Sequence, residues 1–436
     1  MSRTYCVFKS LFELFIQPLR NFKKNNLTNI SQNKLVNYLL LPTMRNGYRH
    51  NLSMLYVLKV AHWFMLTMPI VVLFYKDNGL DMRQVFILQA IYSISIVALE
   101  IPSGYFADVL GRKNSILAGA ILGFLGFLIY SLSYGFTGFV FAEIILGFGQ
   151  SMISGADSAL LYDTLIDNNL ENDYLKHEGG MTSVGNFAEA FAGIIGGLLA
   201  GLSLRYPYYV QTFVAFIGIP AAITLIEPKI SQTKLGLGWK DITETVKFSL
   251  FKNKRLRWNI IYSSVVGAST LAMAWFVQPW FIKANLPVSM FGVAWTILNL
   301  SVGITAYYAY RIELKLGRIN TAAAFTTILA LGFIASGWIT GYLGLFFILL
   351  FYLARGVATP ILKDNINRIT PSNMRATILS VRNFIIRIIF SILGPIYGWS
   401  IDKLSLSAAL TIAGTVFILT SGISFYYFKR TGNLTD

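Results

Sequence analysis

Ionisable side chains lie inside several otherwise apolar stretches, and they are the residues with which this chain could do chemistry. A charged side chain at the centre of a bilayer costs about 2.5–3.5 kcal/mol on insertion scales, so such residues usually face a cavity or a partner. The chemistry open to them is reversible protonation and the binding of a polar or charged solute. They are Lys59, His62, Glu100, Glu143, Asp157, Glu189, Arg355, Arg382 and Arg387.

Three of these residues are candidates for carrying a proton. Glu189 lies about ten residues, or roughly 15 Å, into its apolar run, near the midplane. Withdrawal from water favours the neutral form of a carboxyl group, so Glu189 is the first candidate. A permanent pairing that only holds the helices together is the alternative. His62 is similarly deep, and Lys59 lies one turn away on the same face. For these two, packing and snorkelling are the alternatives.

Fixed positive charge marks the second half of the chain. Arg355, Arg382 and Arg387 could clamp an anionic or zwitterionic substrate, because guanidinium groups bind carboxylates and phosphates in a fixed geometry. They could equally neutralise acids across a central cavity. The uncharged polar residues predicted to shape the same cavity are Asn186, Gln278 and Asn299.

The composition is that of a membrane protein. Of 436 residues, 55% are hydrophobic and 13% are charged, whereas soluble domains carry about 25% charged residues. The single cysteine, Cys6, excludes an internal disulfide and a cysteine-based metal cluster. No nucleotide-binding loop, zinc spacing or nucleophile elbow is present, so we expect no cofactor, no metal and no catalytic residue, and the chain is not predicted to be an enzyme.

Apolar runs long enough to cross a bilayer recur along the chain. They lack the alternation of strands, and helices are therefore predicted, because lipid leaves no partner for unpaired backbone groups. The prediction is an all-α membrane protein of twelve helices, six plus six. The runs cover 52–75, 84–106, 114–134, 138–162, 179–203, 207–226, 258–282, 288–310, 319–341, 342–362, 376–401 and 405–428.

The positive charge is sorted between the connections. With the N-terminus inside, most Lys and Arg residues fall on the cytoplasmic side, which predicts cytoplasmic N- and C-termini in a bacterial inner membrane. This sorting also explains the net charge of +16 without nucleic acid. The predicted organisation is a cytoplasmic tail over 1–50 with a candidate amphipathic interfacial helix, a six-helix bundle over 51–226, a basic cytoplasmic linker over 227–257, a second bundle over 258–430 and a tail over 431–436.

The two halves repeat short patterns at nearly one offset. Leu110-Gly111-Arg112 precedes the third run, and Leu316-Gly317-Arg318 precedes the ninth. Ala192 to Gly196 likewise parallels Gly394 to Gly398. Such echoes predict a duplicated six-helix unit, the architecture from which many transporters are built.

Residues 104–113 read Gly-Tyr-Phe-Ala-Asp-Val-Leu-Gly-Arg-Lys and are interpreted as a ten-residue charged loop between the second and third runs. This segment resembles the signature loop of the major facilitator superfamily, G-x-x-x-D-x-x-G-R-K/R. The resemblance implies two pseudo-symmetric six-helix bundles around a central cavity. It also implies a conformational latch between the halves, made by Gly104, Asp108, Gly111, Arg112, Lys113, Asp157 and Asp163. Asp157 and Asp163 are expected at the C-terminal end of helix 4, where they would need a cation.

Two further family patterns differ here. Glu143 stands where many proton-linked members have an arginine in R-x-x-x-G-x-G, and the helix 5 stretch from Ala192 to Gly197 lacks the proline of G-P-x-x-G-G.

The sequence predicts a secondary transporter that moves a small organic molecule by alternating access. Coupling to protons is expected and efflux is favoured. An importer or uniporter of an anionic nutrient or metal chelate is the first alternative, and a non-transporting membrane scaffold or receptor is the second. The predicted partners are membrane lipids, a small-molecule substrate and protons, with no nucleic acid, and the chain is expected to be a monomer.

Overall fold

A computed structural model describes residues 42–170, 173–228, 244–370 and 374–432. The chain divides into two compact units, residues 1–49 and 50–436. The amphipathic helix predicted within residues 1–50 and most of the predicted linker lie outside the described residues.

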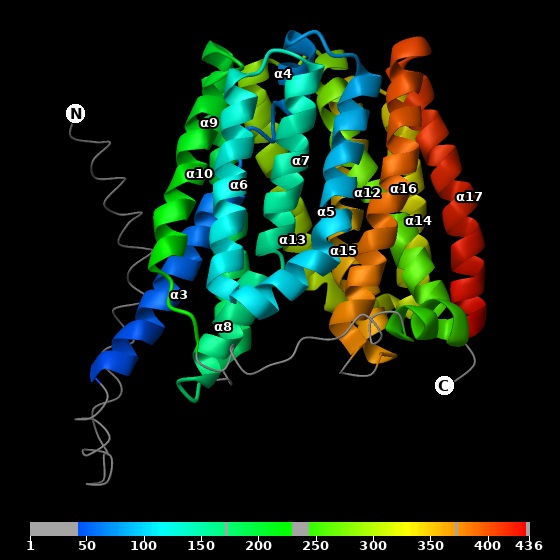
Figure 1. Cartoon of the computed structure of the whole chain (residues 1–436). Helices are drawn as coiled ribbons and strands as arrows, with labels where there is room; N and C mark the ends of the chain where they lie inside the picture. Colours follow the sequence, from blue (N-terminus) through cyan, green and yellow to red (C-terminus); the bar gives the residue numbers. More distant parts are fainter. Residues whose placement is uncertain (1–41, 171–172, 229–243, 371–373, 433–436) are drawn as a thin grey trace, which may run out of the picture. The chain divides into compact units, whose positions relative to one another are not determined.

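All regular secondary structure in the described part of the second unit is helical (Figure 1). Its first half contains α3 (Pro42–Trp63) from His50 onward, and then α4 (Val71–Asp77) and α5 (Met82–Leu110). These are followed by α6 (Arg112–Leu132), α7 (Phe136–Ile153), α8 (Ala156–Ile166), α9 (Tyr174–Leu202) and α10 (Tyr206–Thr224). Its second half contains the short π-helix η3 (Phe248–Lys252), α12 (Lys254–Lys283), α13 (Val288–Leu316), α14 (Arg318–Trp338), α15 (Gly341–Arg368), α16 (Arg375–Lys403) and α17 (Leu406–Gly432).

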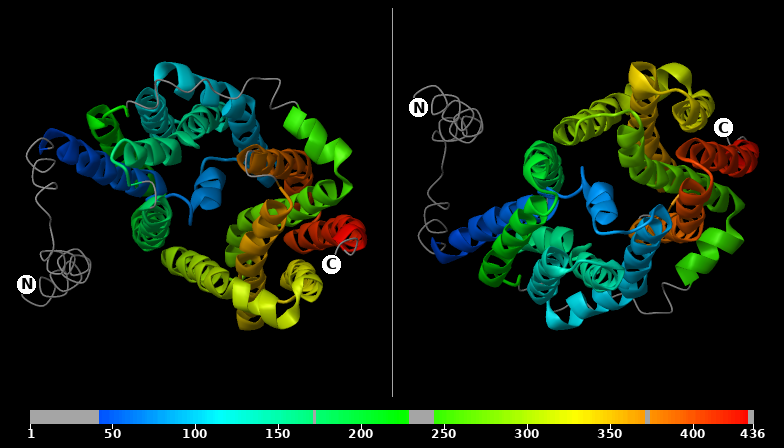
Figure 2. Two further views of the ribbon diagram at one scale, coloured as in Figure 1. Left: turned by 90° about the horizontal axis from the view of Figure 1, so that it is seen from below. Right: turned by 90° about the horizontal axis from the view of Figure 1, so that it is seen from above.

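Eleven helical segments of the described chain are long and apolar enough to span a membrane. The pair α3 and α4 occupies the remaining position of the predicted twelve. The predicted all-α membrane fold is confirmed. The halves meet where α5 packs on α16 and α9 packs on α13, and Figure 2 shows the short α4 among the surrounding helices.

Two predicted spans are each broken into two helices. Residues 64–70 separate α3 from α4 and contain Pro69, which lacks an N–H group and disfavours helical geometry at the residue before it. Ser154 and Gly155 separate α7 from α8, and Gly155 has a φ of 81°, in the left-handed region. The first break frees backbone groups inside the bundle, and side chains of other helices bind them, as described below.

The predicted ten-residue signature loop is wrong. Helix α5 continues to Leu110 and α6 begins at Arg112, so Gly111 is the one non-helical residue between them. Its φ of 95° reverses the chain in a single step, which residues with a Cβ rarely allow. Gly317, with a φ of 78°, performs the same reversal between α13 and α14.

Candidate substrate cavity

A cavity of about 440 Å³ lies inside the second unit, between its two halves. That volume suits a small organic molecule. Its wall is formed by α3, the 64–70 break, α4, α5, α6, α7, α9 and α10 from the first half and by α12, α13, α15 and α16 from the second. Aromatic rings dominate the wall, among them Trp63, Tyr75, Tyr92, Phe127, Tyr130, Tyr208, Trp275, Trp295 and Phe390.

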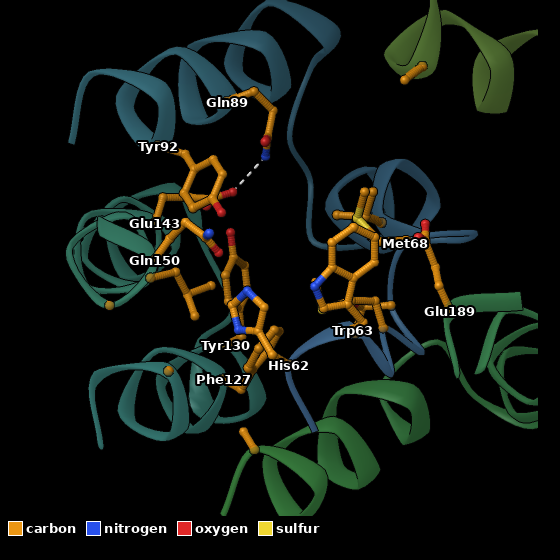
Figure 3. Close-up of a pocket in the computed structure, with 18 of the residues that line it drawn as sticks. His62, Trp63, Met68, Gln89, Tyr92, Phe127, Tyr130, Glu143, Gln150 and Glu189 are labelled. Atoms are coloured by element: carbon orange, nitrogen blue, oxygen red, sulfur yellow. Dashed lines mark hydrogen bonds between the residues drawn. The ribbon is translucent and has the colours of Figure 1, made fainter. Parts of the chain in front are cut away.

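Most of the predicted site residues line this cavity. Figure 3 shows Gln89, Tyr92, Glu143, Gln150, Tyr130 and His62 gathered on one side and Trp63, Met68 and Glu189 on the other. The predicted residues in the wall are His62, Glu189, Gln278, Asn299, Arg355 and Arg387.

Three predicted residues are absent from the wall. Lys59 pairs with Asp157 at 3.4 Å. Asn186 is exposed on the surface of the unit. Arg382 is buried within the second half, where its Nε donates to the Ser263 hydroxyl at 2.5 Å. Position along a helix gave the depth of each residue, but it did not give the direction of its side chain.

Glu189 and Arg355 bring opposite charges from the two halves to one region of the cavity. Glu189 lies in the middle of α9 and interacts electrostatically with Arg355 of α15. The Trp295 indole of α13 lies beside the same carboxyl group. The two charged groups are not in direct ion-pair contact, so a proton or a polar solute has room to alter their interaction.

Gln278 of α12 spans the broken first helix. Its Nε2 donates to the Met68 carbonyl at 2.8 Å, and its Oε1 accepts from the Val72 N–H at 2.9 Å. From the first half itself, Gln211 of α10 accepts from the Leu66 N–H at 2.8 Å. These amide groups satisfy backbone that the break would otherwise leave unpaired in an apolar interior.

The start of α5 is a second point of contact between the halves. Asp81 caps the helix by accepting from the Gln84 N–H at 2.7 Å. Asp402, at the end of α16, accepts from the Met82 and Arg83 N–H groups at 3.0 and 2.7 Å. A carboxylate is favoured at a helix N-terminus by the free N–H groups and the dipole. Asp402 was not among the predicted site residues, because its only signal in the sequence is an acid at the end of an apolar run.

Glu143, the acid that stands where the family has an arginine, was not among the predicted site residues either. The side chain is 5% exposed and lines the cavity. Its Oε1 accepts from the Tyr75 hydroxyl at 2.8 Å and from Gln89 Nε2 at 2.6 Å. Tyr75 and Tyr130 share a hydrogen bond of 2.6 Å. This buried network joins α4, α5, α6 and α7.

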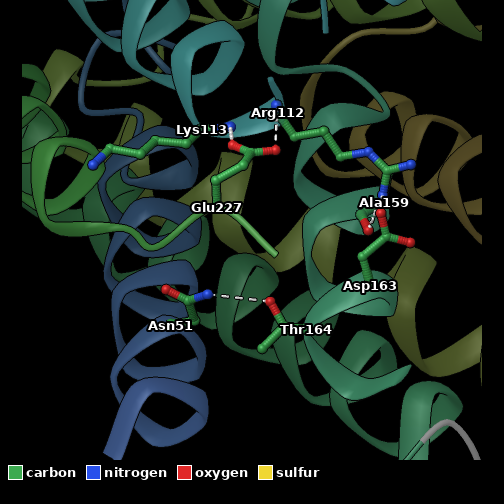
Figure 4. A network of polar contacts seen from close by, with 7 residues as sticks. All are labelled: Asn51, Arg112, Lys113, Ala159, Asp163, Thr164 and Glu227. Carbon is green, nitrogen blue, oxygen red and sulfur yellow. Dashed lines mark hydrogen bonds and ion pairs between the residues drawn. The ribbon is translucent and has the colours of Figure 1, made fainter. Parts of the chain in front are cut away.

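Three of the predicted latch residues, Arg112, Lys113 and Asp163, belong to a polar cluster within the first half (Figure 4). Arg112 is ion-paired with the fully buried Asp163 and donates to the Ala159 carbonyl at 2.5 Å. Glu227, just beyond α10, accepts from the backbone N–H groups of Arg112 and Lys113 at 2.9 and 2.7 Å and so caps α6. The ion pair and the cap tie α6 to α8 and to the end of α10, and not to the second half.

The other latch residues differ from the prediction in position. Asp157 lies in the first turn of α8, where the helix dipole favours an acid, because the break at Gly155 starts a new helix there. Its partner is Lys59 and not Arg112. Gly104 and Asp108 lie within α5, and the predicted role of the Asp108 side chain lies outside what the structure describes.

Removing the Arg112 side chain is expected to destabilise the first half. Arg112→Ala leaves the Asp163 carboxylate buried without its cation, and breaking a buried pair in this way costs about 3–5 kcal/mol. A lowered melting temperature of the purified protein in detergent checks this. Lys113→Ala is the matched control, since it removes the same charge from the next residue. Equal melting temperatures for the two variants would contradict the assigned role of the pair.

The fold and the cavity define a multi-pass membrane carrier. A family model described as Major Facilitator Superfamily matches residues 52–395. The chain belongs to this superfamily, whose members are carriers and not enzymes.

The similar proteins are distant. Quinolone resistance protein NorA of Staphylococcus aureus is 26% identical over 169 residues, which cover 38% of this chain and 42% of NorA. The match thus spans less than half the length of that relative. The uncharacterized MFS-type transporter YxaM of Bacillus subtilis (strain 168) is 21% identical over 364 residues, 80% of this chain and 88% of YxaM.

Solved structures share the fold. The nucleoside transporter NupG superposes with a TM-score of 0.71 at 15% identity and covers 90% of this chain and 100% of its own. The D-xylose-proton symporter gives a TM-score of 0.68 at 13% identity, with coverage of 88% and 98%. At these identities, the likeness shows the architecture alone.

Proposed function

We propose that the protein is a proton-coupled secondary transporter that moves a small organic molecule out of the cell by alternating access. The observation that carries the proposal is the cavity between the halves, in which Glu189 of α9 faces Arg355 of α15. A proton on Glu189 removes the negative charge that Arg355 interacts with, which weakens the attraction between the halves. Proton binding and the relative position of the halves are thereby linked.

The contacts between the halves also support alternating access. The Asp402 bonds to α5 and the Gln278 bonds to residues 68–72 join the halves toward one end of the bundle. At this end of the bundle, the connections that follow α4 and α16 carry few Lys and Arg residues. Because basic residues favour the cytoplasmic side, we assign this end to the outside and both termini to the cytoplasm. In this state the cavity is closed toward the outside.

Efflux is the proposed direction because the cavity wall is rich in aromatic rings, which suit apolar molecules that reach the carrier through the membrane. Arg355 and Arg387 in the same wall favour the alternative, an importer or uniporter of an anionic nutrient or metal chelate. Each of these arginines, however, has an acidic neighbour in the first half, Glu189 and Glu100 respectively.

The test is transport by the purified protein in liposomes that contain a pH-sensitive dye. Candidate molecules of both charge signs are added under an imposed pH gradient. The proposal predicts that a transported molecule moves protons in the opposite direction. Flux of a molecule without proton movement would identify a uniporter. Absence of any flux for a broad panel would favour a non-transporting protein.

A further inference from the structure

We propose that Glu143 and the aromatic rings around it form a subsite for the charged group of an organic cation. This inference rests on the proposed transport function and adds the substrate class to it. It differs from the role given to Glu189, because among the described residues the hydrogen-bond partners of Glu143 are first-half groups and none is a cation.

The carboxylate is held in place by neutral donors. Tyr75 and Gln89 both donate to its Oε1, and Tyr130 holds the Tyr75 hydroxyl. Tyr75 and Tyr130 are almost completely buried, and Tyr130 stacks on Phe139 at a centroid distance of 5.3 Å. The carboxylate is therefore fixed at the cavity wall before any ligand arrives. Binding then costs little conformational entropy of the protein side chains.

The arginines that line the cavity interact with acids other than Glu143, and they do not neutralise its charge. Arg355 interacts with Glu189, and Arg387 interacts with Glu100. His62 lies near the Lys59–Asp157 pair and Gln150. Among the described residues, none places a cation within ion-pair distance of Glu143.

Arg205 lies at this end of the first half, and its donors bind other groups. Its guanidinium nitrogens donate to Asn78 Oδ1 at 2.5 Å and to the carbonyls of Ser131 and Ser133 at 3.2 and 3.0 Å. Its planar group also lies 3.6 Å from the centroid of the Tyr134 ring. Arg205 thus closes the end of the bundle and does not neutralise Glu143.

The rings beside Glu143 complete a site for a cation. Tyr75, Tyr92, Phe127, Tyr130 and Tyr208 line the same cavity. Aromatic faces attract cations, and the attraction grows when water is excluded. A carboxylate next to several rings therefore favours a bulky organic cation, whose diffuse charge loses little hydration on entry. The Glu143 carboxylate would repel an anion at this end of the cavity.

The experiment compares two probes of equal size and opposite charge, tetraphenylphosphonium and tetraphenylborate. Equilibrium dialysis of radiolabelled probe against the purified full-length protein gives the affinities, with detergent-only samples subtracted. We expect the wild type to bind tetraphenylphosphonium more tightly than tetraphenylborate. Glu143→Gln, which keeps the shape of the side chain, should weaken tetraphenylphosphonium binding by about tenfold or more, because a desolvated charge partner is lost. Tetraphenylborate binding should not weaken.

Asp77→Asn is the control, because it makes the same acid-to-amide change at an exposed residue that does not line the cavity. It should change tetraphenylphosphonium affinity by less than about twofold. If Glu143→Gln fails to fold, Tyr92→Leu serves instead. It removes an aromatic face, leaves the Glu143 hydrogen bonds intact and should weaken binding of the cation alone.

Equal affinities of the wild type for the two probes would overturn the inference, as would a preference for tetraphenylborate. Equal weakening of both probes by Glu143→Gln, or no weakening, would also overturn it. Because these are equilibrium measurements without a gradient, they are independent of proton coupling. Glu143-dependent cation binding without proton movement in liposomes would leave the subsite standing and reject the coupling.

Discussion

Replacing Glu189 with glutamine is expected to reduce substrate-driven proton movement to the background of protein-free liposomes. Glutamine keeps the size of the side chain but cannot gain or lose a proton. Each pH unit across the membrane supplies about 1.4 kcal/mol per proton carried, and a carrier without its protonation site cannot use that free energy. The dye-loaded liposomes described above provide the measurement, with wild type and variant reconstituted at the same density.

Exchange of labelled for unlabelled substrate across the same membranes separates loss of coupling from loss of folding. It requires the cavity and the movement of the halves, but no net proton transfer. Glu189→Gln should therefore retain exchange within about threefold, as expected when a mutation removes one step and leaves binding intact. Unchanged proton movement in the variant would remove Glu189 from the mechanism.

The second large effect is expected from a single methyl group at Gly292. In α13 this glycine lies against α9, and a Cβ there would meet the Gly193 carbonyl group and lie 3.2 Å from the Cα of Gly197. Backbone atoms cannot move aside as a side chain can, so α9 and α13 must separate. We expect Gly292→Ala to cost about 1–3 kcal/mol of stability in this state, as overpacking does, and to reduce exchange at least fivefold.

A control for the Gly292 substitution lies on the same helix. A Cβ at Gly303 would have no atom within 4 Å among the described residues. Gly303→Ala should leave the melting temperature and the exchange rate unchanged or slightly raised, because alanine favours a helix more than glycine does. If Gly303→Ala reduced exchange as much as Gly292→Ala, close packing of α9 and α13 would not be the cause.

The bounds of a helix were predicted well from the sequence where the chain reverses at each end of an apolar run. The ninth run was predicted over 319–341, and α14 covers Arg318–Trp338. Gly317 supports this boundary because it adopts a left-handed conformation that ends one helix and starts the next. The parallel positions of Gly111 and Gly317 also agree with the repeat inferred from the two Leu-Gly-Arg patterns.

Features that depend on distant partners could not be predicted. The break at 64–70 persists because Gln278 and Gln211 bind its backbone, and neither is near it in sequence. The signature segment carries charges that suggest a loop, but no residue from Tyr105 to Leu110 breaks a helix. Glu143 was noted only as an acid in place of a family arginine, whereas its surroundings depend on Tyr75 and Gln89 from two other helices.

The central claim is that the two halves separate at the end where Asp402 now caps α5. The chain has one cysteine, so Cys6→Ser provides a background for a pair of spin labels at the exposed residues Asp77 and Lys403, one in each half. Double electron–electron resonance in lipid nanodiscs measures their separation. The account predicts a short and a long distance whose populations shift between acidic and basic pH and on addition of substrate. A single distance that is the same under all these conditions would contradict it.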